Sequence, residues 1–342
     1  MGLFDFFRKK NNDKAPSVTS RPEALFDIIS GALVDGELPE SFSLPTKDDS
    51  RLHFADGAED GICIYHMGRS ANTDETKKEM GGAVTAASSG DFSKADQLFD
   101  KLGTHARALY SIDDIQAYIL QNREKLDPTN CLRYAIHAIT TSSCKETVKY
   151  GLCILELFNT DEKPDVKNII RTIGLCDEFT LFSVFIMRAW KNGNEEILNL
   201  AKKVHGWGRV HAVERIEAVT DEIKRWLLTD GVHNNVLPAY SAMDCWTKSG
   251  AYEILKGNPT KEEFAGIRDI IDGLLDEGPV PGISQFDDGD DIIISFLKHA
   301  KNMCDCIEDY KVVRSIRIHY DDDKDANPEI ASLCKEILFS DI

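Results

Sequence analysis

The amino-acid sequence predicts an all-α fold, specifically an α-solenoid of stacked antiparallel helix pairs of the HEAT or armadillo type. Apolar residues recur at helical spacing in stretches of about ten residues. Helices this short are marginal in water, so their neighbours along the chain must cover their apolar sides. The stretches also come in pairs with a period of about 35 to 45 residues, which is typical of two-helix repeats. These pairs lie at 128–158, 164–190, 194–219 and 220–256.

The first residues, 1–15, read as an amphipathic segment followed by a polar tether. Four apolar side chains precede three basic residues, a pattern that peripheral membrane anchors share. A terminal helix that folds back on the protein has the same pattern, and we favour that interpretation. Any contact with a membrane is expected only through the four apolar residues Leu3, Phe4, Phe6 and Phe7.

Residues 16–90 are expected to form a small irregular region that packs on the helical repeats. Pro22 is placed to open a helix at its first position. Residues 52–54 and 62–66 are the strand-like runs of the chain, and the turn-rich sequence ADGAEDG separates them. This pattern predicts a short β-hairpin. Glycines indicate a further loose connection at Gly81, Gly82 and Gly90.

Residues 91–342 are predicted to form a helical-repeat domain. Capping boxes, in which a hydroxyl and a carboxyl satisfy the free amides of a first turn, mark three helix starts. They pair Ser111 with Asp114, Ser143 with Glu146, and Thr260 with Glu263. Prolines are expected in the first turns of three helices, at Pro128, Pro164 and Pro328. Two stretches, 150–158 and 179–190, are apolar on nearly all sides, so we expect them in the interior.

The composition restricts the class of partner and the compartment. The chain has a formal net charge of -18 and a pI of about 4.9. Binding to nucleic acid or anionic lipid needs clustered Lys and Arg, so both are disfavoured. Nine cysteines without a CxxC pair favour a reducing compartment. No apolar run is long enough to span a bilayer, and the N-terminus lacks the charge order of a secretory leader. We therefore expect a cytoplasmic protein.

The densest collection of chemically useful side chains lies at a predicted helix-turn-helix junction. A histidine there could transfer a proton, and an arginine could hold an anionic ligand. A structural interpretation competes and is favoured, in which the tryptophan fills the turn and the histidines donate to carbonyls at helix ends. Residues 200–226 hold six Lys or Arg and four Asp or Glu, so this stretch carries a net charge of +2. The candidate ligand- or partner-binding residues are His205, Trp207, Arg209, His211 and Glu214.

The sequence predicts neither a metal site nor a cofactor. His211 and Glu214 would share a helix face, but there is no HExxH motif and no third ligand at a recognisable spacing. Aspartates at 321, 323 and 325 imitate an EF-hand loop, yet Ala326 stands where glycine is needed and Ser332 where the bidentate glutamate belongs. Neither a phosphate-binding glycine loop nor a GxSxG nucleophile elbow occurs.

Two segments carry a family resemblance. The sequence GRVHAVERI at 208–216 resembles the start of the second helix in a HEAT-type repeat. WGRVHAVERI and WLLTDGVHNNV are also similar to segments of a bacterial family sometimes labelled limonene hydroxylase, and this similarity covers about the last two thirds of the chain. Terpene hydroxylation would need haem, flavin or non-haem iron, and the chain has no dinucleotide fingerprint for a flavin. The label therefore carries no catalytic residue over to this sequence.

The leading hypothesis is a non-catalytic scaffold that binds a protein partner along the surface of stacked helices. The alternative is a HEAT-like enzyme acting on nucleic acid, similar to the alkylpurine DNA glycosylases. That enzyme would use a basic surface with aromatic side chains, and Arg209 would lie among four tryptophans. The acidic balance of the chain argues against it. The tryptophans in question are Trp190, Trp207, Trp226 and Trp246.

Overall fold

The structure is a computed structural model that describes residues 22–45, 53–68, 70–278, 280–321 and 327–339. Within these ranges the chain is helical, and β-pairing is limited to one isolated antiparallel bridge between Val34 and Glu37. The all-α prediction is confirmed. None of the helices described is long and apolar enough to cross a membrane. The predicted amphipathic segment at 1–15 lies outside the described residues.

The described residues form two compact units. Unit 1 lies within Met1–Asp56 and Arg69–Lys191, and unit 2 lies within Gly57–Gly68 and Asn192–Ile342. The helices of unit 1 are α2 (Leu25–Ala32), α4 (Asp74–Ser88), α5 (Phe92–Leu102), α6 (Ala108–Gln121), α7 (Pro128–Thr141), α8 (Lys145–Leu155), α9 (Pro164–Gly174) and α10 (Asp177–Met187).

Unit 2 contains ten α-helices in its described part, together with a π-helix, η1, and a short 3-10 helix, η2. In chain order they are α3 (Ala58–Ile62), η1 (Cys63–Met67), α11 (Gly193–Ala201), α12 (Trp207–Arg215), α13 (Asp221–Thr229), α14 (Ala239–Ser249), α15 (Ala251–Lys256), α16 (Lys261–Leu275), η2 (Ile283–Gln285), α17 (Gly289–Met303), α18 (Ile307–Asp321) and α19 (Pro328–Phe339).

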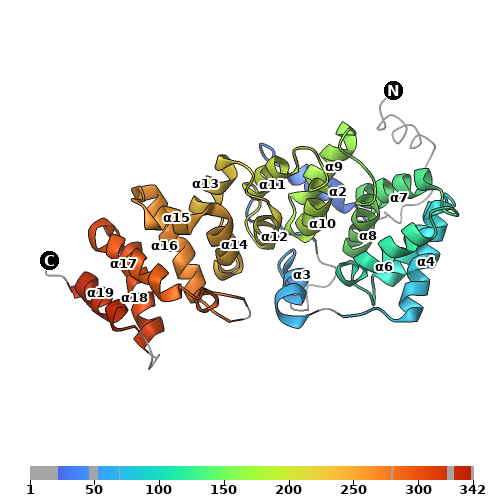
Figure 1. Cartoon of the computed structure of the whole chain (residues 1–342). Helices are drawn as coiled ribbons and strands as arrows, with labels where there is room; N and C mark the ends of the chain where they lie inside the picture. Colours follow the sequence, from blue (N-terminus) through green and yellow to red (C-terminus); the bar gives the residue numbers. More distant parts are fainter. Residues whose placement is uncertain (1–21, 46–52, 69, 279, 322–326, 340–342) are drawn as a thin grey trace. The chain divides into compact units, whose positions relative to one another are not determined.

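Helices pack mainly against near neighbours in sequence, and several alternate helices form rows. In unit 1, α4 contacts α6, α6 contacts α8, and α8 contacts α10. In unit 2, α12, α14, α16 and α18 form a corresponding row, while α15, α17 and α19 form a second one. Figure 1 shows α4, α6 and α8 in cyan to green, and α14, α16 and α18 in yellow to red. This packing is consistent with a helical repeat.

The interior of unit 1 contains the two helices that the sequence predicted to be covered on all sides. Every residue of α8 from 147 to 155 is buried, and nearly all of α10 is buried as well. Lys149 of α8 is among these buried residues. Its Nζ lies 2.6 Å from Oε1 of Glu178 and 3.4 Å from Oε1 of Glu146. Lys145 joins Glu178 to Asp56 at 3.1 and 2.9 Å, so the buried charges form one network.

The predicted β-hairpin is wrong. Residues 62–66 are helical, because α3 ends at Ile62 and η1 covers the rest, and residues 53 and 54 are outside any strand. Residue 52 lies outside the described residues. A short apolar run cannot distinguish strand from helix by itself. Contacts of this segment with α12 decide the outcome, and these contacts are invisible in local sequence.

The glycines at 81 and 82 do not mark a loose connection, since α4 runs through both of them. A Cβ on Gly81 would lie 2.6 Å from the Tyr118 ring, so the absence of a side chain allows α6 to approach α4 closely. Helix α4 also packs against α5 on the other side of Gly90. Gly90 itself has a φ of 84°, which favours glycine at this turn.

Four of the predicted helix starts are correct. Thr260 and Glu263 form a complete capping box on α16, and prolines occupy the first positions of α7, α9 and α19. The boxes at Ser111 and Ser143 are wrong, because α6 begins at Ala108 and α8 at Lys145. The first amide of α6 instead donates to Oε2 of Glu146 on α8, at 2.6 Å. Helix α2 begins at Leu25 rather than at Pro22.

Replacement of Glu178 by glutamine is expected to destabilise unit 1 by about 3 to 5 kcal/mol, because it leaves the buried Lys149 ammonium without its nearest counter-charge. The measurement is urea unfolding followed by circular dichroism. The control is Glu79→Gln, which removes the partner of the exposed Lys101 and His105 side chains and should leave the midpoint almost unchanged. Equal, small effects of both substitutions would contradict a structural role for the network.

Candidate functional site

A cluster of aromatic and ionisable side chains lies in unit 2, where α3 and η1 pack on α12 and α14. We call its α12 and α14 side the Trp207 cradle, comprising Trp207, Val210, His211, Glu214 and Tyr240. The segment that covers it is Gly57–Gly68, the 57–68 segment. Ala58 of this segment packs with Trp207 and Val210, and Tyr65 and Tyr240 extend the apolar contact.

Two features of the sequence allow the 57–68 segment to seat on the cradle. Gly57 and Gly68 have φ values of 76° and 70°, so the chain turns sharply at both ends in a conformation that favours glycine. Gly61 faces the indole directly, and a Cβ there would lie 2.2 Å from the Trp207 ring. Any larger residue at position 61 would therefore force the segment and the tryptophan apart.

The aromatic rings pack closely around Trp207. The Tyr240 ring centroid lies 4.9 Å from that of Trp207, and the Tyr65 centroid lies 5.8 Å from Trp207 and 4.8 Å from Tyr240. His66 of η1 shares a 2.6 Å hydrogen bond with the Tyr240 hydroxyl. Tilted ring pairs at these separations are favourable beyond the area they bury. Trp207 therefore packs between α12, α14 and the 57–68 segment, whereas the structural interpretation of the sequence placed it in the turn.

Charged groups border the aromatic cluster. The Tyr65 hydroxyl donates to Oε2 of Glu214 at 3.1 Å, and the Arg215 guanidinium pairs with the same oxygen. Lys248 of α14 donates to the carbonyl oxygens of Val213 and Glu214 and pairs with Asp244 at 2.8 Å. Burial alone would raise the pKa of Glu214, but the nearby His211 and Arg215 outweigh burial and lower the pKa below its usual range. Glu214 is therefore a carboxylate at neutral pH.

His211 is the unusual member of the cradle. Its side chain is 1% exposed, and within the described part of the chain neither ring nitrogen has a hydrogen-bond partner. Nδ1 lies 3.9 Å from Oε2 of Glu214, too far for a hydrogen bond. Burial is the largest influence and lowers the pKa of His211, while the carboxylates of Glu214 and Asp60 oppose it and Arg215 adds to it. The imidazole is therefore neutral at pH 7, and its hydrogen-bonding capacity is unused.

The remaining two sequence candidates lie beside the cradle, in contacts that hold the fold. His205 is in the turn between α11 and α12, where its carbonyl oxygen accepts from the Asn235 amide at 2.7 Å. Arg209 donates from Nε to the Ala201 carbonyl at 3.1 Å and from Nη1 to the His233 carbonyl. Its guanidinium also lies 5.4 Å from the Trp226 ring centre. Arg209 thus connects α11, α12 and α13. The guanidinium N–H groups that make these contacts are the ones that would otherwise bind an anion.

The five candidates of the sequence all lie in unit 2, and three of them belong to the cradle. Sequence reasoning missed Asp60, Tyr65 and Tyr240, which come from α3, η1 and α14. Tyr65 and Glu214 are 149 residues apart in the chain, so no local motif could join them. The available signal was the glycines at 57, 61 and 68, of which the first two fall in the sequence ADGAEDG that predicts a turn.

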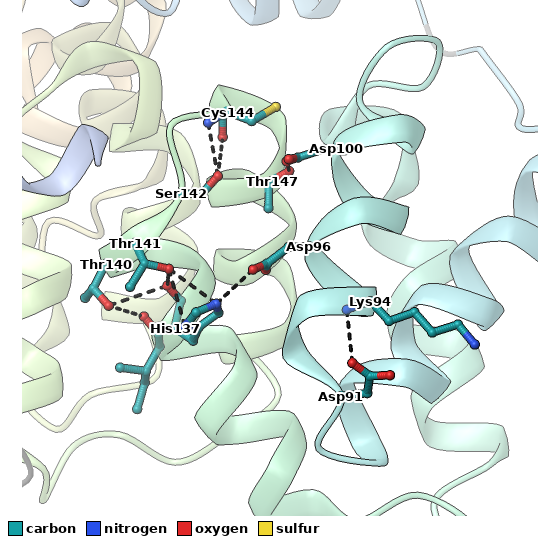
Figure 2. A network of polar contacts seen from close by, with 11 residues as sticks. Asp91, Lys94, Asp96, Asp100, His137, Thr140, Thr141, Ser142, Cys144 and Thr147 are labelled. Atoms are coloured by element: carbon teal, nitrogen blue, oxygen red, sulfur yellow. Dashed lines mark hydrogen bonds and ion pairs between the residues drawn. The ribbon is translucent and has the colours of Figure 1, made fainter. Parts of the chain in front are cut away.

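A second polar network lies in unit 1, shown in Figure 2. Nε2 of His137 on α7 lies 3.0 Å from Oδ2 of Asp96 on α5, and Thr147 of α8 donates to Asp100 at 2.6 Å. An Asp-His pair beside a hydroxyl invites comparison with a catalytic triad. However, the Thr141 hydroxyl donates to the His137 carbonyl of its own helix at 2.8 Å. The network therefore fastens α5 to α7 and α8.

One group of side chains in the described residues has the proximity that a metal ion requires, formed by Asp305, Cys306 and Asp309. Its oxygen atoms already have other partners. The Asp309 carboxylate accepts from Arg268 at 2.8 Å and from the amides of Asp305 and Cys306 at 2.9 and 3.2 Å. Asp305 pairs with Lys261. These contacts form a capped helix start, and we derive no metal chemistry from them.

Comparison of the chain with protein-family models finds no match, and comparisons with curated proteins and with solved structures find none either. The site must therefore be interpreted from its own geometry. It combines a neutral imidazole, a carboxylate and a phenol, and the 57–68 segment packs on Trp207 beside them.

His211 is expected to make the stability of unit 2 depend on pH. Because the folded-state pKa lies below the ordinary value of 6.5, the unfolded chain binds the proton more readily. The neutral imidazole contributes its full stabilisation of the folded state above pH 6.5. This stabilisation is lost as the pH falls through the folded-state pKa. Urea unfolding at pH 7 and pH 5 should show a larger loss for the wild type than for His211→Met. Parallel losses in both proteins would exclude this role.

Proposed function

We propose that the chain is a non-catalytic protein-interaction scaffold, built as an α-solenoid of HEAT- or armadillo-like helix pairs, that binds its partner along the α12, α14, α16 and α18 row of unit 2. Two features support the solenoid form: consecutive helices pack as pairs, and alternate helices contact one another in rows. Such rows present equivalent helix faces side by side, which is how solenoids build extended binding surfaces. Assignment to binding follows from this architecture by analogy.

A groove on this row carries the proposal. It has a volume of about 460 Å³ and lies where the start of α14 meets the ends of α16 and α18. Leu237 and Ile318 line it and remain 39% and 55% exposed. Large apolar side chains gathered at a groove, rather than scattered over the surface, are typical of protein-binding sites.

The charge of the groove indicates the chemistry of the partner. Asp272 and Asp276 line the same groove beside the two apolar residues, and the whole chain carries a net charge of -18. A complementary segment would place an apolar side chain between Leu237 and Ile318 and a lysine or arginine next to the aspartates. Complementary charges of this kind increase the association rate and the selectivity for the partner.

The alternative, a HEAT-like enzyme acting on nucleic acid, has weaker support. It requires exposed aromatic faces on which bases can stack. Trp190, Trp207, Trp226 and Trp246 are only 4%, 6%, 8% and 4% exposed. Trp190 also donates to Thr160 inside unit 1. Buried rings offer no stacking face, so the scaffold is the better-supported proposal.

The test is cross-linking of the tagged full chain in its native cells, followed by mass spectrometry. We expect a protein partner linked to residues around α16 and α18, with its yield reduced roughly tenfold by Ile318→Glu, since a charge would replace a buried apolar contact. The matched control is Val219→Glu, at another exposed apolar residue of unit 2 that does not line the groove. Equal yields from both variants and the wild type would refute the groove as the binding surface.

A further inference from the structure

We propose that the 57–68 segment is a removable internal cover, and that a short helical segment of the partner replaces it on the Trp207 cradle. The inference rests on the proposed scaffold function, and it names a second part of the partner site. The incoming segment would present glycine or alanine to the Trp207 indole and a tyrosine to Glu214, as the cover does. It would also supply a polar group to His211.

The position of the cover supports this inference. The cradle lies on α12 and α14, which belong to the same row as the helices that line the groove. Val236 packs against the cradle and Tyr240 belongs to it, while the intervening residues Leu237, Pro238 and Ala239 line the groove. Cradle and groove are therefore consecutive along the row. A partner extended over the groove would meet the cover next.

The cover has little stability of its own. Helix α3 and the π-helix η1 follow each other without a break and together span ten residues, a length at which an isolated helix is marginal in water. π-helices are rare and occur frequently at functional sites. The turns at Gly57 and Gly68 mark both ends of the segment. Its helical form is thus a consequence of occupying the cradle, as expected of a segment that can leave it.

His211 indicates that the cover is an incomplete fit. Buried side-chain nitrogens normally have a hydrogen-bond partner, and a missing one calls for an explanation. Here Ala58, Gly61 and Tyr65 fill the apolar part of the cradle but leave both imidazole nitrogens without a hydrogen bond. A ligand with an amide or carboxyl group at this point would satisfy the imidazole and keep the aromatic contacts. Such a ligand would bind more tightly than the cover.

The test uses full-length protein and a fluorescent synthetic peptide with the sequence of residues 57–68, under reducing conditions. Gly61→Leu should expel the cover, because no side chain fits between Gly61 and the indole. Fluorescence anisotropy should then show peptide binding at least tenfold tighter to Gly61→Leu than to the wild type. The matched control is Gly82→Leu in α4, where a Cβ meets nothing within 4 Å, and it should behave as the wild type.

Tyr65→Ala provides a second variant if Gly61→Leu fails to fold, since it removes the ring contacts and the hydrogen bond to Glu214 without steric overlap. A peptide of the same composition in scrambled order should not bind either variant. Equal binding to variant and wild type, or no binding to a folded variant, would overturn the cover. This result is separable from the groove test, which depends on Ile318 and would be unaffected by the peptide.

Discussion

The constraint on which this structure depends is that its helices are too short to be stable alone. Helices α11, α12 and α13 have nine residues each, and isolated helices of this length are largely unfolded in water. Each must bury its apolar side against a neighbour, and the nearest neighbours are the adjacent helices in sequence. The rows of alternate helices follow from this requirement. The same holds for the 57–68 segment, whose ten helical residues pack on α12 and α14.

Each unit has buried side-chain atoms without a hydrogen bond among its described residues, such as Tyr134 Oη in unit 1 and Ser249 Oγ in unit 2, so the informative contrast is between the buried ionisable groups Lys149 and His211. In unit 1 the buried Lys149 has carboxylates on both sides, so its charge is compensated within the fold. In unit 2 the buried His211 has no hydrogen bond, although Glu214 lies only 3.9 Å away. A satisfied buried network stabilises one conformation, whereas an unsatisfied group favours any rearrangement or ligand that provides a partner. The contrast supports a structural role for the first cluster and a binding role for the second.

Local patterns in the sequence were sufficient for the helical class, for the capping box at Thr260 and for the two largely buried helices α8 and α10. Local patterns gave wrong predictions where contacts with residues distant in sequence determine the structure. Glu146 was assigned to a box with Ser143, but it satisfies the start of α6 instead. The pattern at 62–66 predicts a strand, but the segment is helical. Its helix packs on Trp207, and local sequence does not reveal that contact. Only part of the cradle could be predicted from the sequence. Its α12 residues lie close together in the chain, whereas their partners in η1 and α14 are far from them in sequence.

Mutual dependence of neighbouring helices can be measured most directly by hydrogen-deuterium exchange on Gly266→Ala. A Cβ at Gly266 of α16 would lie 2.2 Å from the Leu228 carbonyl oxygen of α13, so the two helices would have to separate. If short helices are stable only in contact with one another, amide protection should fall in α13 and α14 as well as in α16, and remain unchanged in unit 1. Loss of protection confined to α16 would contradict the account.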